Sequence, residues 1–106
     1  MDANEYQRLC EITAGGDNND RIAYTAMGLS GEAGEVLDET KKLLYHKHPY
    51  DLDKFLKELG DVAWYLAMCS LAHGFTLSEV MEANIKKLQA RYPEGFSTDA
   101  SINRTA

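Results

Sequence analysis

Residues 28–42 read GLSGEAGEVLDETKK, and residues 57–67 read KELGDVAWYLA. In both stretches apolar residues recur at the three- and four-residue intervals of an amphipathic helix. Each stretch also carries two carboxylates three positions apart, Glu32 with Glu35 and Glu58 with Asp61. Residues at this spacing share one helix face, with Cβ atoms about 5–6 Å apart, so their oxygens could bind one hard cation. The two stretches together predict a divalent metal site built on two helices.

Spacing alone does not select these two pairs, because the chain contains six pairs of acids three positions apart. The surroundings of Glu35 set its pair apart, since the charged residues three or four positions away are all acidic: Glu32, Asp38 and Glu39. Such like-charged neighbours repel one another, and a bound metal ion would supply the missing counter-charge. For the second pair an alternative stays open, in which Lys54 and Lys57 form ordinary surface ion pairs with these acids.

Length and charge restrict the class of protein. A chain of 106 residues forms one domain, here residues 1–106, with a thin core. The net charge of −6 argues against binding to nucleic acid. There is no apolar run long enough to span a membrane and no signal peptide, so we expect a cytoplasmic protein that does not bind membranes. Cys10 and Cys69 lie among apolar residues and are expected to be small core residues.

Four helices are expected to account for nearly all of the sequence, which predicts an all-α fold. They run over about 4–13, 21–45, 52–72 and 77–92, and the polar run Asp17 to Asp20 offers a cap for the second. Asp51 can cap the third, and Thr76 with Glu79 has the form of a capping box for the fourth. Pro93 ends that helix. Residues 94–106 are expected to form an irregular tail.

Three glycines lie inside the second predicted helix at intervals of three: Gly28, Gly31 and Gly34. Each costs up to about 1 kcal/mol relative to alanine in a helix interior. Such a row indicates that something packs close, either another backbone or a ligand, and a local kink is a further alternative.

These stretches, together with NIKKLQARYPEGF at residues 84–96 and, more weakly, EYQRLCEITA at residues 5–14, resemble the MazG-like nucleotide pyrophosphohydrolases. That family belongs to the all-α NTP pyrophosphatase superfamily and forms a four-helix bundle-like fold. Its hallmark is an ExxE motif followed by ExxD, and here residues 36–57 lie between the two. The resemblance extends over nearly the whole chain.

The resemblance implies Mg²⁺-dependent cleavage of nucleoside triphosphates between the α and β phosphates, with Mn²⁺ as a substitute ion. The acids of the two motifs would be the catalytic metal ligands, and we choose Glu35 as the base that activates water. Other matching positions would contact the substrate: Lys87, Arg91, Asn84 and Tyr65. A basic helix end that favours the helix dipole is the alternative account of Lys87 and Arg91.

The family completes its active site with a second subunit, so the resemblance implies a homodimer or homotetramer. Phosphoribosyl-ATP pyrophosphatase is a related alternative, but its characteristic Tyr-His pair after the acidic motif is absent here. A third alternative is a non-catalytic helical module that binds metal or nucleotide. Nothing in the sequence selects the base or the sugar of the substrate.

Overall fold

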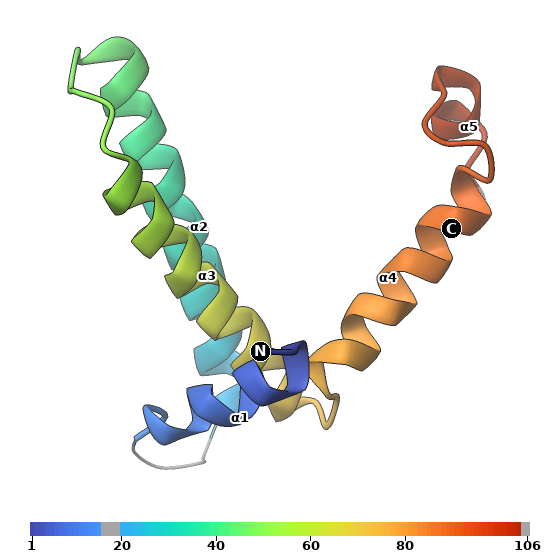
Figure 1. Ribbon diagram of the computed structural model, residues 1–106, viewed down its shortest axis with the longest axis horizontal. Coiled ribbons are helices and arrows are strands. Elements are labelled where there is room, and N and C mark those ends of the chain that lie inside the picture. Colours follow the sequence, from blue (N-terminus) through green and yellow to red (C-terminus); the bar gives the residue numbers. More distant parts are fainter. Residues whose placement is uncertain (16–19, 105–106) are drawn as a thin grey trace.

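The computed structural model describes residues 1–15 and 20–104, and over these ranges the fold is all-α, as expected (Figure 1). Five helices follow one another along the chain: α1 (Ala3–Ile12), α2 (Arg21–Tyr45), α3 (Leu52–Ala72), α4 (Leu77–Arg91) and α5 (Thr98–Ile102). Among the described residues the one β-type pairing is an isolated bridge between Pro93 and Gly95. In the same ranges none of the helices combines the length and apolar character needed to cross a membrane.

Side-chain caps fix the beginnings of α3 and α4 where the sequence predicted them. Asp51 accepts a hydrogen bond from the Lys54 N–H at 3.2 Å. The Thr76 hydroxyl accepts from the Glu79 N–H at 3.2 Å and donates to the Glu79 carboxylate at 3.0 Å. The two bonds from the Lys54 and Glu79 N–H groups satisfy backbone donors that a first helical turn leaves without partners.

Two predictions, one for the start of α2 and one for the C-terminal tail, need correction. Asp20 occupies the N-cap position of α2, but with φ at 62° it is left-handed and its side chain makes no capping bond; residues 17–19 of the predicted cap lie outside the described residues. The tail is not irregular throughout, because residues 98–102 form α5. Its start is fixed by Ser97, whose hydroxyl accepts from the Ala100 N–H at 3.0 Å.

Helices α2 and α3 lie side by side along most of their length, and α1 crosses the end of this hairpin. Helix α4 starts at the same end and then runs away from the hairpin, so the chain has the outline of an open V (Figure 1). The radius of gyration is 16.8 Å, whereas a compact domain of this length has about 13 Å. One chain alone therefore does not close the expected bundle.

The core lies at the vertex of the V, where α1, the end of α3 and the start of α4 meet. Its buried apolar residues are Cys10, Ala67, Met68 and Leu77, and both cysteines are free thiols, with Cys69 half-buried. The buried Gln7 amide ties the three helices together. It donates to the carbonyls of Ala67 and Phe75 at 3.0 and 3.1 Å, and it accepts from the Leu77 N–H at 3.1 Å.

Candidate functional site

Three of the four predicted carboxylates converge between α2 and α3. One oxygen each from Glu32, Glu58 and Asp61 lies within 4.8 Å of the others. The helical spacing of the motifs places Glu58 and Asp61 on one face of α3, and the hairpin brings Glu32 of α2 opposite them. The fourth acid, Glu35, lies one turn further along α2, is exposed and is outside this group.

The lysines that could have neutralised Glu58 and Asp61 are engaged elsewhere. Lys54 binds Glu39 across the hairpin at 2.9 Å, and Lys57 binds Asp53 on its own helix at 2.8 Å. Within the described ranges, no ion pair joins a lysine or arginine to any of the three clustered acids. The surface ion-pair alternative for the second motif is therefore wrong in this structure.

The electrostatics of the cluster follow from this arrangement. The pKa of Glu32 is raised above its ordinary value, first by partial loss of solvent and then by the charges of Asp61, Glu58 and Glu35. Like-charged groups held together favour the protonated form, and a cation between them would reverse that preference. Three carboxylates are also the hard oxygen ligands that Mg²⁺ and related ions prefer, so the donor set fits a divalent ion.

An open pocket of about 420 Å³ lies beside the cluster. It is lined by Glu32 and Asp61 together with Thr13 and three aromatic residues, Tyr24, Trp64 and Tyr65. The Tyr24 and Tyr65 hydroxyls are 3.4 Å apart, and this hydrogen bond is the largest cause that raises the pKa of Tyr65. The Trp64 indole donates to the Thr13 hydroxyl at 2.8 Å and packs partly against the core.

Sequence reasoning had named Tyr65 but had missed Tyr24 and Thr13 as pocket residues. A signal for Tyr24 exists, because Tyr24, Gly28 and Glu32 follow one another at intervals of four and so share one face of α2. No comparable local signal exists for Thr13. It reaches the pocket because α1 crosses the hairpin, which the sequence pattern does not specify.

The structure does not bring three of the predicted substrate contacts to the acids within one chain. Asn84, Lys87 and Arg91 lie on α4, which diverges from the hairpin, and none of them lines the pocket (Figure 1). Asn84 and Lys87 are exposed. The Arg91 guanidinium carbon is 5.9 Å from the centre of the Tyr92 ring, within the range of a cation–π contact.

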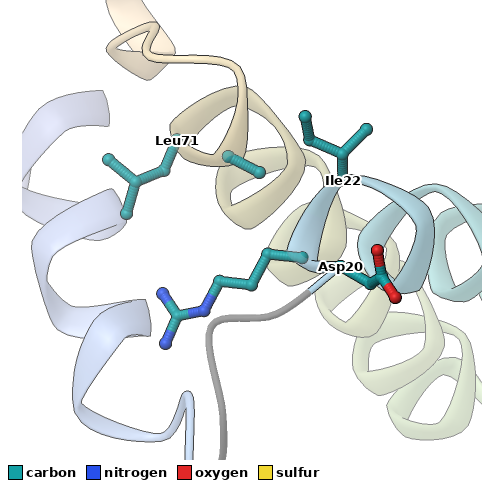
Figure 2. A pocket seen from close by; sticks show the side chains of 5 residues that line it. Asp20, Ile22 and Leu71 are labelled. Carbon is teal, nitrogen blue, oxygen red and sulfur yellow. The ribbon is translucent and has the colours of Figure 1, made fainter.

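A second pocket, of about 370 Å³, lies between the start of α2 and the end of α3. Figure 2 shows Asp20 and Leu71 on opposite sides of it, and Arg21, Ile22 and Ala72 complete its lining. It contains one carboxylate and none of the predicted site residues. The pocket beside the three clustered acids is therefore the better candidate for the active site.

Comparison with known proteins identifies the family of the chain. The sequence profile of the MazG nucleotide pyrophosphohydrolase domain matches residues 22–96, a range that contains all four motif acids and the whole of α4. The chain belongs to the MazG nucleotide pyrophosphohydrolase family. It is also similar to the Gene 37 protein of Mycobacterium phage L5, with 37% identity over 92 residues that cover 83% of this chain and 81% of the phage protein. No solved structure matches.

Family membership gives the acidic cluster a chemical context. MazG enzymes are nucleotide pyrophosphohydrolases and generally depend on a divalent metal ion. In this chain the cluster of Glu32, Glu58 and Asp61 could hold such an ion, and the aromatic pocket beside it is open to a ligand.

Proposed function

We propose that the chain hydrolyses ribo- or deoxyribonucleoside triphosphates between the α and β phosphates, with Mg²⁺ as cofactor, and releases a nucleoside monophosphate and pyrophosphate. The observation that carries this proposal is the convergence of Glu32, Glu58 and Asp61 from two helices in a chain of the MazG family. Mg²⁺ bound there would neutralise phosphate charge and lower the pKa of the attacking water.

The chain's own residues would then divide the remaining work. Glu35 lies one turn beyond Glu32 and is exposed, so we assign to it the removal of the proton from the attacking water. Its carboxylate would take this proton while the water oxygen bonds to the α phosphorus. The bond from that phosphorus to the α–β bridging oxygen would break, and pyrophosphate would leave with the electrons of that bond. The Tyr65 hydroxyl, at the wall of the pocket, would contact the bound nucleotide.

The basic residues require a second copy of the chain. Lys87 and Arg91 would hold phosphate oxygens as charge builds on the leaving pyrophosphate, and Asn84 would line the substrate pocket, but α4 leads all three away from the acids of their own chain. We therefore propose a homodimer or homotetramer in which α4 of one subunit approaches the acidic cluster of another. The acids are then supplied by one chain and the cations by its partner.

The exposed surface supports this assembly. Large apolar side chains that are more than half exposed lie on all three long helices: Met27, Leu37 and Leu44 on α2, Leu52, Leu56 and Leu59 on α3, and Met81 and Ile85 on α4. The chain exposes 7871 Å², whereas a folded monomer of 11.9 kDa exposes about 6,000 Å². The excess of about 1,900 Å² per chain is in the range of an obligate interface.

Product analysis tests the reaction. The pure protein is incubated with a panel of ribo- and deoxyribonucleoside triphosphates, with Mg²⁺, with Mn²⁺ and with chelator. We expect metal-dependent formation of monophosphate and pyrophosphate, and loss of turnover with retained folding in Glu35→Gln. Diphosphate plus phosphate would contradict the assigned bond, no turnover of any nucleotide would favour a binding module, and wild-type turnover in Glu35→Gln would remove Glu35 from the mechanism.

Mixed subunits test the shared site. Asp61→Asn and Lys87→Ala are expected to be nearly inactive alone, because each removes one half of the site. When the two variants are co-expressed, half of the random dimers are mixed and one of their two sites is intact, so activity should return to about a quarter of wild type. If both halves came from the same chain, mixing would restore nothing.

A further inference from the structure

The three glycines of α2 differ in what surrounds them. A methyl group placed on Gly31 or Gly34 would meet no atom within 4 Å. On Gly28 it would overlap ring carbons Cδ1, Cε1 and Cζ of Tyr65. Of the three glycines, Gly28 alone has a neighbouring side chain that leaves no room for a methyl group.

The Tyr65 ring also has neighbours on other sides. The Trp64 indole packs edge-on against it, with ring centres 4.9 Å apart and planes at 78°. Tyr24 lies one turn before Gly28 on α2. The centres of the Tyr24 and Tyr65 rings are 6.0 Å apart, and the two hydroxyls are 3.4 Å apart. A side chain at position 28 would therefore displace the ring from an aromatic cluster, since the ring is rigid and its contacts with Tyr24 and Trp64 depend on its place against α2.

We propose that Gly28 is a positioning residue that acts through Tyr65. The absence of a side chain at position 28 lets the Tyr65 ring lie against the backbone of α2, which keeps its hydroxyl beside Tyr24 and at the wall of the pocket that Glu32 and Asp61 line. This inference rests on the proposed function, in which Tyr65 contacts the nucleotide. It makes Gly28 a determinant of substrate binding although Gly28 itself touches no substrate.

Gly28→Ala tests the inference, and Gly31→Ala is its matched control, since both substitutions add one methyl to the same helix. In Gly28→Ala we expect kcat/KM to fall about tenfold, mainly through KM, whereas Gly31→Ala should stay within about twofold of wild type. The substitution is then repeated in a Tyr65→Ala background, where the ring is gone. There Gly28→Ala should cause no further loss of kcat/KM, because the added methyl group has no ring left to displace.

Fluorescence supplies a readout that does not depend on turnover. Trp64 is the single tryptophan of the chain and packs against Tyr65, so its emission reports the position of that ring. We expect Gly28→Ala to change the Trp64 emission when Tyr65 is present. In the Tyr65→Ala background the same substitution should leave the emission unchanged. Unchanged emission and unchanged kinetics in Gly28→Ala would overturn the proposal, as would equal losses in both backgrounds.

Two outcomes need separate interpretation. If the wild-type protein hydrolyses no nucleotide, the proposed function fails, while the fluorescence comparison still decides whether Gly28 holds Tyr65 in place. If Gly28→Ala does not fold, restored folding in Gly28→Ala/Tyr65→Ala supports the steric coupling. Failure of that double variant to fold, when Tyr65→Ala alone folds, would contradict it.

Discussion

The vertex and the acidic cluster both gather polar groups from distant parts of the chain, but they satisfy them differently. At the vertex the buried Gln7 amide uses its nitrogen twice and its oxygen once, and all three partners are backbone groups. In the cluster, Glu32, Glu58 and Asp61 bring three negative charges together, and in the described part of the chain no lysine or arginine pairs with them. The polar groups at the vertex are paired within the chain, whereas the cluster leaves three like charges together that could hold a cation. This difference separates residues that stabilise the fold from residues that are available for chemistry.

The largest effect is expected from removing one charge of the cluster. Asp61→Asn should lower kcat/KM by about 1,000-fold, because a lost ligand weakens both metal binding and charge stabilisation in the transition state. Its free energy of unfolding without metal should not fall, since the change relieves repulsion. Steady-state kinetics and urea unfolding check the two halves of the prediction.

Asp53→Asn is the control for this variant, because it removes a carboxylate from the same helix but one that is paired with Lys57. Its activity should stay near wild type. If Asp61→Asn retained full activity while Asp53→Asn lost it, the assignment of the site would be wrong.

The opposite result is expected at the vertex. Gln7→Ala removes three hydrogen bonds from a residue that is 5% exposed and leaves their backbone partners unsatisfied. We expect the free energy of unfolding to fall by about 2–4 kcal/mol, with catalysis retained in the fraction that is folded.

Urea unfolding at a fixed protein concentration measures this change, because the stability of an oligomer depends on concentration. Glu11→Ala, on the exposed side of α1, is the control and should change stability by less than about 0.5 kcal/mol. A loss this small in Gln7→Ala would show that the amide is dispensable.

The same division explains what could be predicted from the sequence. Helix positions and the caps at Asp51 and Thr76 depend on neighbours a few residues away, so periodicity and capping residues were sufficient. The convergence of three acids also follows from two local spacings and one hairpin. The role of Gln7 could not be predicted, because it depends on which backbone groups two other helices present.

The apolar faces of the helices show the same difference between local patterns, which the sequence predicts, and distant contacts, which it does not. The helical periodicity of residues 28–42 predicted an amphipathic helix, and the structure has one, but Leu37 and Leu44 of α2 are more than half exposed in the single chain. A pattern indicates which face is apolar and does not indicate what covers it. The direction of α4 depends on distant contacts for the same reason, since the hydrogen bonds that join it to Asn4 and Gln7 of α1 lie in its first turn.

The smallest expected effect is a pH dependence of stability that has opposite signs at two acids of α2. The pKa of Glu32 is raised in the folded protein, so between the unfolded and folded values the folded state binds more protons. Its contribution to stability is therefore present at low pH and is lost as the pH rises through the folded pKa. The pKa of Asp38 is lowered by hydrogen bonds to Lys42 and Lys41, so its contribution is present at neutral pH and is lost on acidification.

Two neutral variants, measured in the presence of chelator, separate the stability contributions of Glu32 and Asp38. Each variant removes one titrating group and leaves the others in place. Glu32→Gln should become more stable than wild type as the pH rises from about 4 to 7, whereas Asp38→Asn should become less stable over the same interval. Adding Mg²⁺ at pH 7 should stabilise wild type more than Glu32→Gln, because a cation bound by the cluster removes the repulsion that the amide had already relieved. Thermal unfolding across this pH series measures all three differences, and equal stabilisation of both proteins by Mg²⁺ would mean that the ion binds elsewhere.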